Sequence, residues 1–263
     1  MLCFRSFIRI FVPILTDLSM YAQEQIKPYD GNAHKREQVE RLFDSIAPTY
    51  DALNHTLSFG FDRAWRSKAV KAVASYQPQT VLDVATGTGD FALLLARKLR
   101  LRKVTAVDIS DGMMRVGREK AAREGLHDVV IFKKEDCSRL SFDDGCFDAV
   151  TVTFGIRNFE NLDACMGEIL RVLRKGGHLV MLELSYPNRK LWRFLFGIYS
   201  RLVMPVVGRI ISGDDSAYTY LPETMKAFPQ GEVMSQILHD NGFKKASFHR
   251  LTMGICTLYV AEK

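Results

Sequence analysis

The spacing of apolar residues differs between two parts of this chain. From Lys35 to Ser75 apolar side chains recur every three or four residues, which is the spacing of an amphipathic helix. Pro48 interrupts this pattern, and a second helical run from Phe61 to Ala74 ends before Pro78. These positions predict an α-helical cap that precedes the first strand.

From Thr80 onward short apolar runs alternate with amphipathic segments. This alternation predicts a parallel, doubly wound sheet with right-handed crossovers. The predicted strands are Thr80–Ala85, Lys103–Asp108, Val129–Lys134, Phe147–Thr153 and His178–Glu183, and the helices between them are Phe91–Leu99, Asp111–Glu124 and Asp163–Leu173.

The alternation stops after Glu183. Residues 186–231 form an insertion, and a helix is predicted over Gly231–Asn241. Only two residues separate the last two strands, Phe243–Leu251 and Gly254–Glu262, so they are expected to pair antiparallel. The fold class is therefore α/β and Rossmann-like, a mostly parallel seven-stranded sheet with an antiparallel last strand. Residues 35–263 form one domain.

A glycine loop lies between the first predicted strand and its helix. Gly87, Thr88 and Gly89 allow a sharp turn and a close approach of the backbone to a ligand. Asp108 ends the second strand, where a carboxylate can bind ribose hydroxyls. These features fit either a dinucleotide or S-adenosylmethionine.

Three further acids favour S-adenosylmethionine. Asp83 can accept from a methionyl ammonium, directly or through water, and Asp90 follows the glycine loop; both would repel a pyrophosphate. Asp136 can accept from an adenine amino group while the backbone of Cys137 binds a ring nitrogen. Any one of them could be a helix cap or surface acid. As a set they lie at strand carboxyl ends, where such sheets bind ligands.

Several motifs carry a family resemblance. They are Tyr50-Asp51-Ala52-Leu53-Asn54, Ser58-Phe59-Gly60, Arg63-Ala64-Trp65-Arg66, Phe154-Gly155-Ile156-Arg157-Asn158 and Glu183-Leu184-Ser185. From about Lys35 to the C-terminus the chain resembles the menaquinone and ubiquinone biosynthesis C-methyltransferases. The resemblance implies methylation of demethylmenaquinol to menaquinol, with a ubiquinone-route benzoquinol or another lipid as the alternative substrate. It also implies cofactor contacts at Thr88, Asp108, Asp136, Cys137 and Thr153.

One departure from the family bears on catalysis. Asp62 stands where the family usually has histidine, which puts a catalytic role at that position in doubt. Smaller departures are Leu53, Lys175 and Thr224.

Methylating a quinol carbon calls for a phenolate and hence for a cation and a base. Arg157 is the candidate to stabilise the phenolate, and Asp90 is the candidate base. The alternatives are an ion pair for Arg157 and a helix-terminal acid for Asp90. The candidates to line the substrate pocket are Tyr50, Asn158, Tyr218 and Tyr220.

Two segments bear on membranes and on the start of the fold. Residues 1–34 are expected to be an extension outside the fold, with Met20 a candidate start. Within the insertion, Arg193, Arg201 and Arg209 recur every eight residues among large apolar side chains. This spacing, with Pro205, argues against a membrane span and favours an interfacial element or a lid over a prenyl tail. A packing or dimer-forming helix is the alternative.

Composition narrows the remaining classes. The net charge of +6 comes without a zinc-finger spacing or basic stripe, so no nucleic-acid partner is expected. The cysteines are scattered, which predicts a reduced, cytoplasmic compartment, and the histidines are scattered too, which predicts no metal site. With the arginine-spaced insertion, the expected location is cytoplasmic with peripheral contact at the inner face of the membrane. An NAD-dependent oxidoreductase and a non-catalytic cofactor-binding scaffold are the competing functions.

Overall fold

The chain folds around one seven-stranded sheet. The computed structural model describes residues 21–204, 206, 207 and 216–263. The strand order is β3-β2-β1-β4-β5-β7-β6. The strands are β1 (Thr80–Val84), β2 (Lys103–Asp108), β3 (Val130–Lys134), β4 (Phe147–Thr153), β5 (Leu173–Leu184), β6 (Lys244–Leu251) and β7 (Cys256–Glu262).

The pairing confirms the predicted fold class. β1 runs parallel to β2 and β4, β3 is parallel to β2, and β5 is parallel to β4. β7 inserts between β5 and β6 and is antiparallel to both. β5 begins at Leu173 rather than at His178, because its first residues pair with Phe147 across a register shift. Lys175 is therefore part of this long strand.

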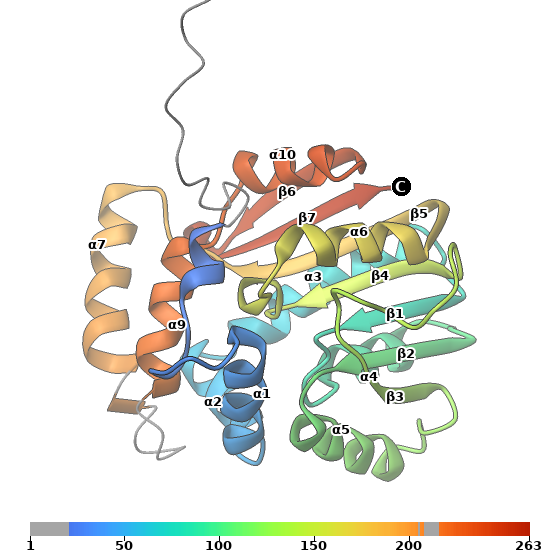
Figure 1. Ribbon diagram of the computed structural model, residues 1–263, viewed down its shortest axis with the longest axis horizontal. Coiled ribbons are helices and arrows are strands. Elements are labelled where there is room, and N and C mark those ends of the chain that lie inside the picture. The colour runs from blue at the N-terminus through green and yellow to red at the C-terminus, as the bar shows by residue number, and fades with distance from the viewer. Residues whose placement is uncertain (1–20, 205, 208–215) are drawn as a thin grey trace, which may run out of the picture.

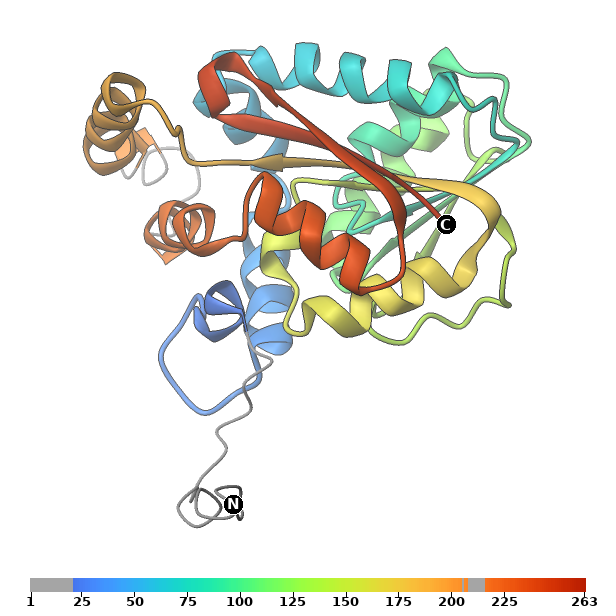
Figure 2. The ribbon, with the colours of Figure 1, turned by 90° about the horizontal axis from the view of Figure 1, so that it is seen from above.

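Helices cover both faces of the sheet (Figure 2). On one face α3 (Phe61–Ala74) and α4 (Asp90–Lys98) bury Trp65, Ala69 and Leu95, and α5 (Asp111–Arg123) adds Ala121. On the other face α6 (Leu162–Val172) and α10 (Glu232–Asp240) pack into a second core. Burial of these apolar stripes stabilises the layers, at about 25 cal/mol per Å² of apolar surface.

The remaining helices stand beyond the carboxyl ends of the parallel strands (Figure 1). They are α1 (Lys35–Ile46), α2 (Tyr50–Leu57), α7 (Lys190–Ile198) and α9 (Ser216–Ala227), and a π-helical turn over Tyr199–Val203 continues α7. α2 was not predicted as a separate helix. It begins two residues after Pro48, which ends α1 as expected. This group of helices forms the outer walls of the cavities described below.

The fold begins earlier than Lys35. A 3-10 turn over Ala22–Gln25 packs against the domain: the Glu24 carboxylate accepts a hydrogen bond of 2.6 Å from the backbone of Leu162, and the Tyr21 hydroxyl donates to Asp163. Lys35 is buried, and its ammonium donates to the carbonyl of Gln23 at 2.5 Å. The expectation that all of residues 1–34 lie outside the fold is therefore wrong for residues 21–34. Met20 and the residues before it lie outside the described part of the chain.

Candidate functional site

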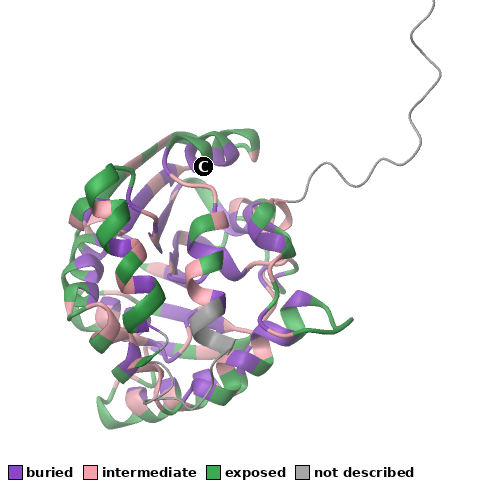
Figure 3. Ribbon diagram, turned by 90° about the vertical axis from the view of Figure 1, so that its left-hand side faces the viewer, coloured by how far each residue is buried: buried purple, intermediate pink, exposed green. Residues whose placement is uncertain are grey.

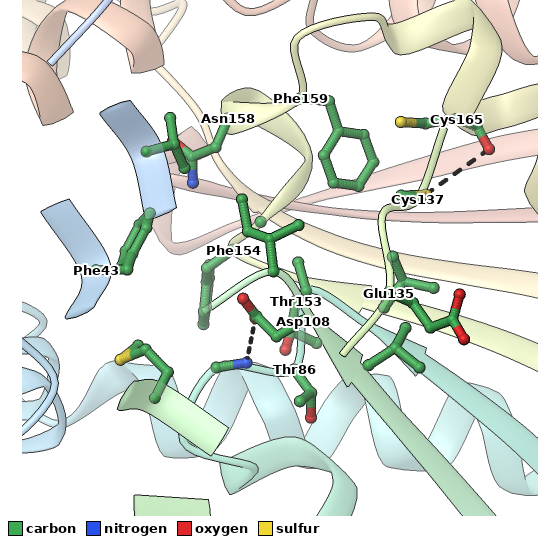
Figure 4. A pocket seen from close by; sticks show the side chains of 18 of the residues that line it. Phe43, Thr86, Asp108, Glu135, Cys137, Thr153, Phe154, Asn158, Phe159 and Cys165 are labelled. Carbon is green, nitrogen blue, oxygen red and sulfur yellow. Dashed lines mark hydrogen bonds between the residues drawn. The ribbon is translucent and has the colours of Figure 1, made fainter. Parts of the chain in front are cut away.

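A cavity opens at the carboxyl ends of β1, β2, β3 and β4. Figure 4 shows Asp108, Thr153, Phe154 and Asn158 facing into it. The predicted site residues that line it are Tyr50, Gly87, Thr88, Asp90, Asp108, Asp136, Cys137, Thr153 and Asn158. Residues that are far apart in the sequence thus meet where the sheet topology predicts a ligand.

The glycine loop forms the floor of the cavity. Gly87 and Gly89 have φ values of 57° and 74°, which a side chain disfavours. A Cβ at Gly89 would come within 2.6 Å of the Phe132 ring, so glycine is required there for space as well. The Thr88 hydroxyl donates a 2.5 Å hydrogen bond to Asp51 of α2, which ties the loop to the cap.

Asp83 lies behind the loop and not among the residues that line the cavity. Its carboxylate accepts hydrogen bonds from the hydroxyls of Thr86 at 2.6 Å and Thr151 at 2.5 Å. Burial raises the pKa of this carboxyl to about 6, although both hydrogen bonds favour the charged form. A direct contact with a methionyl ammonium, one of the two predicted modes, is therefore not supported; Asp83 supports Thr86 from beneath.

Asp108, predicted to bind a ribose, holds the glycine loop. It accepts from the backbone N–H of Gly87 at 2.8 Å (the lower dashed line in Figure 4) and from that of Ser110 at 2.9 Å. Burial raises the pKa of this carboxyl against these hydrogen bonds. The carboxylate thus fixes the glycine loop and still faces the cavity.

The opposite end of the cavity holds Asp136 and Cys137. Asp136 accepts from Arg36 of α1 at 2.8 Å and from the backbone and hydroxyl of Ser138. Although burial opposes ionisation, these donors hold the pKa of Asp136 below its ordinary value. Arg36 was missed from the sequence, because the partner that defines it lies a hundred residues away.

Asp90 joins a network of charges beside the loop. Its carboxylate accepts from Lys120 at 2.7 Å and lies 3.8 Å from the guanidinium of Arg66. Lys120 also pairs with Asp51. Although burial opposes the charge, Arg66 and Lys120 hold the pKa of Asp90 below its ordinary value. Asp90 is also the first residue of α4, so the alternative of a helix-terminal acid holds at the level of geometry.

A second cavity, of about 1090 Å³, lies between α2, α3, α7 and α9. Its wall is mostly apolar: Leu57, Phe59, Phe61, Trp65, Phe154, Leu184, Trp192, Leu195, Phe196, Tyr199, Met204, Leu221, Met225 and Ile255. Among the described residues that line it, Arg157 is the basic side chain and Asp62 is the acidic one. Phe154 belongs to the walls of both cavities.

Arg157 enters this wall as part of a buried ion pair. Its guanidinium donates to Glu183, at the end of β5, at 2.6 Å, and to the carbonyl of Phe154 at 2.5 Å. Burial opposes the charge, but Glu183 holds the pKa of Arg157 above its ordinary value. The ion pair left open by the sequence is present, and the arginine nonetheless reaches the apolar cavity.

Comparison with known proteins shows the family to which the chain belongs. The sequence profile of the ubiE/COQ5 methyltransferase family matches residues 32–263. The chain belongs to the ubiE/COQ5 methyltransferase family. It is therefore a methyltransferase, and its cofactor is S-adenosylmethionine.

Curated relatives extend over nearly the whole chain. The demethylmenaquinone methyltransferase of Bacteroides fragilis is 56% identical over 92% of this chain and 99% of its own length. The protein named ubiquinone/menaquinone biosynthesis C-methyltransferase UbiE from Geotalea daltonii is 40% identical over 87% of this chain and 97% of its own.

Solved structures share the fold at low identity. The [4+2]-cyclase SpnF is 19% identical, with a TM-score of 0.64 over 87% of this chain and 96% of its own. A SAM-dependent methyltransferase from Thermotoga maritima, 16% identical, has a TM-score of 0.59 over 85% of this chain and 99% of its own.

The first cavity fits the family's cofactor. Gly87 lines the cavity without a side chain of its own, and buried nitrogens of Arg66, which also lines it, have no hydrogen-bond partner. The resemblance implies cofactor contacts at Thr88, Asp108, Asp136, Cys137 and Thr153, and all five line this cavity.

The family's missing histidine has a counterpart seven residues earlier. The Nδ1 atom of His55 lies 2.8 Å from the Asp62 carboxylate, which also accepts from Ser58 at 2.8 Å. An imidazole is therefore present at this junction of α2 and α3, but it belongs to His55 and is hydrogen bonded to the residue at position 62. His55 and Asp51 were not among the predicted site residues.

The predicted substrate residues divide between several places. Tyr50 and Asn158 line the first cavity. Tyr220 is buried with its hydroxyl unpartnered, and burial raises the pKa of that hydroxyl strongly. Tyr218 lies on α9, but its side chain is outside the described part of the structure. Pro205 and Arg209 lie outside the described residues.

Proposed function

We propose that this enzyme methylates a ring carbon of demethylmenaquinol to give menaquinol. The observation that carries the proposal is the apolar cavity that shares Phe154 with the cofactor cavity and holds one arginine. A prenylated ring needs such a cavity, and curated relatives at 56% and 45% identity are named demethylmenaquinone methyltransferases. The relatives named for both quinones keep a polyprenyl benzoquinol as the second candidate.

The chemistry required of the site is modest. When bound, S-adenosylmethionine would supply a methyl group and leave as S-adenosylhomocysteine, its carbon–sulfur bond being exchanged for a carbon–carbon bond to the ring. The methylated ring carbon then gives up its proton, which restores the aromatic ring. A quinol carbon becomes a better nucleophile once a neighbouring hydroxyl is a phenolate. Arg157, charged and largely removed from water, would stabilise that phenolate. Correct placement of the two reactants can lower the barrier by up to roughly 7–11 kcal/mol.

Asp90 is the proposed base, which would accept the proton of the quinol hydroxyl through water. Its lowered pKa makes it a weak base, so its share of the rate is expected to be smaller than that of Arg157. Asp90→Asn should therefore slow turnover less than Arg157→Ala does, and should raise the pH needed for full activity only slightly.

The test of substrate uses labelled S-adenosylmethionine with a chemically reduced demethylated naphthoquinone and, separately, a demethylated benzoquinone. Label in the naphthoquinol alone supports the proposal, and label in both shows a dual-pathway enzyme. Label in neither, with cofactor binding intact, would overturn the quinol assignment.

The test of Arg157 separates chemistry from cofactor binding. Arg157→Ala, combined with Glu183→Gln to avoid a stranded carboxylate, should lower the rate constant about 100-fold or more while cofactor affinity stays near wild type. Glu183→Gln alone is the matched control. An equal loss of cofactor affinity would remove Arg157 from the catalytic role.

We also propose that α7 meets a membrane surface peripherally, as a cytoplasmic enzyme at the inner face would. Among the described residues, no helix combines the length and apolarity needed to cross a bilayer. The inward face of α7, with Trp192 and Phe196, lines the second cavity. Its outward face exposes Leu191, Phe194 and Ile198, and the side of the molecule that carries α7 faces the viewer in Figure 3.

Positively charged side chains on and next to the same helix would attract anionic lipid headgroups. Arg189, Lys190, Arg193 and Arg201 are exposed beside these apolar side chains. Such a helix lies in the interface plane, with its basic side chains at the headgroups. A prenyl tail could then pass from the lipid into the second cavity without crossing water.

Cosedimentation with phosphatidylglycerol vesicles tests this contact. Phe194→Glu with Leu202→Glu should reduce vesicle binding at least tenfold, because two apolar side chains are replaced by charges that anionic lipid repels. Val233→Glu, on α10, is the control, since Val233 is as exposed as these residues but lies on another face. No binding by wild type would remove the membrane proposal.

A further inference from the structure

Arg66 is a buried cation whose donors are not used. It lies on α3, is 6% exposed, and lines the first cavity beside Asp90. Its guanidinium lies over the ring of Phe154, 5.1 Å from the centroid. The Nε and Nη1 atoms are both buried, and neither has a hydrogen-bond partner. A buried donor without a partner costs free energy, so a guanidinium held this way calls for an acceptor.

The neighbouring carboxylates do not supply that acceptor. Asp62 lies 4.0 Å from Nε, and Asp90 lies 3.8 Å from Nη2, both beyond hydrogen-bonding distance. Each carboxylate makes shorter bonds elsewhere, Asp62 with His55 and Ser58 and Asp90 with Lys120. These acids hold the guanidinium in place without hydrogen bonding to it, so the fork formed by Nη1 and Nη2 is available, and such a fork matches a two-oxygen anion.

The cofactor carries one such anion, the carboxylate of its methionyl part. Arg36 and Arg66 are the cations among the described residues that line this cavity. Arg36 is committed to Asp136 at the adenine end. Arg66 stands at the other end, beside the glycine loop and Asp90. We propose that Arg66 binds the carboxylate of S-adenosylmethionine.

A competing partner for Arg66 is the phenolate of the second ligand. Arg66 does not line the second cavity in the described part of the chain, whereas Arg157 does. The two arginines lie on either side of Phe154: Arg66 stacks on its ring, and Arg157 donates to its carbonyl. The geometry therefore divides the two anions between the two arginines.

The test compares S-adenosylmethionine with its decarboxylated counterpart, the adenosyl methylthiopropylamine, by calorimetry. Wild type should bind the decarboxylated compound about 10- to 100-fold more weakly, or about 1.4–2.8 kcal/mol. Arg66→Met should bind both compounds equally, at about the wild-type affinity for the decarboxylated one. Arg66→Lys, which keeps the charge but not the fork, should retain part of the discrimination.

Arg36→Met is the matched control, since it removes the cavity's other guanidinium. It should weaken both compounds by the same factor and leave the discrimination intact. Thermal melts of each variant check the fold. If Arg66→Met discriminates as wild type does, or weakens both compounds alike, the assignment is overturned. An increase in the Michaelis constant for the quinol alone would assign Arg66 to the phenolate instead.

Discussion

His55 and Asp62 form a hydrogen bond of 2.8 Å across the junction of α2 and α3. The carboxylate is almost fully buried, while the imidazole is about one-third exposed. The bond holds the first turn of α3 against the cap, and Asp62 thereby keeps a fixed place in the wall of the second cavity.

Exchanging the two residues should preserve this junction. His55→Asp alone sets two carboxylates against each other, and Asp62→His alone sets two imidazoles against each other. Each should lower the free energy of unfolding by about 1–3 kcal/mol. The double exchange should recover most of that loss, giving a coupling energy that urea denaturation of the four proteins measures. Additive losses would show that the pair does not stabilise the junction.

The ion pair between Arg157 and Glu183 makes a second prediction about stability. Glu183→Gln leaves a buried guanidinium without its counter-ion, which is expected to cost about 3–5 kcal/mol. Arg157→Met together with Glu183→Leu removes both charges and should be closer to wild type than either single change. Thermal unfolding compares the variants, and a double variant less stable than both singles would contradict the argument.

Cofactor affinity should fall in acid. Asp83, with a pKa of about 6, is protonated below that pH, and binding of a ligand that carries a sulfonium and an ammonium favours the ionised form. The dissociation constant should therefore rise by up to about tenfold per pH unit below pH 6. Asp83→Asn should flatten the profile but not abolish it, since burial raises the pKa of Asp108 as well. An unchanged profile would exclude Asp83 as the titrating group.

The buried ammonium of Lys35 predicts a stability change in base. Burial lowers its pKa to about 8, whereas the unfolded chain has the ordinary value near 10.5. Between these values the unfolded chain binds more protons, so the group's contribution to stability increases as pH rises from 8 towards 10.5. Relative to Lys35→Met, wild type should gain about 1–3 kcal/mol across this window.

Denaturant titrations at pH 7.5 and 10 measure that difference. Lys68→Met, at an exposed lysine of α3, is the control, and its difference from wild type should stay constant. A constant difference for Lys35→Met would mean that the ammonium keeps its proton throughout.

Local patterns were enough to predict the sheet. The predicted limits of β2 and β4 match the structure, because their apolar runs end in polar residues at Asp108 and Thr153. The glycine loop and the acids at strand ends were found for the same reason: their positions follow from the topology. The reversed β7 followed from the short connection before it.

Contacts between distant segments could not be predicted in this way. Arg66 and Asp51 lie on cap helices and were identified only as parts of family motifs. Their roles depend on how α2 and α3 pack over the glycine loop. The sequence pattern places Lys35 only at the start of a helix, whereas in the structure its ammonium is buried and donates to the carbonyl of Gln23 in the turn over Ala22–Gln25. Sequence periodicity carries no information on which helix faces which loop.

Phe154 has a consequence for how the two ligands affect each other's binding. It has a left-handed backbone with φ of 60°, directly after β4, and its side chain belongs to both cavities. Such a conformation costs of order 1–3 kcal/mol and persists where the surroundings fix it. Under the proposed assignment of the two cavities, one aromatic ring separates the methyl donor from the acceptor. If binding of the donor changes the free energy of rotating that ring, it also changes the affinity for the acceptor. By linkage, the acceptor then changes the affinity for the donor by the same factor.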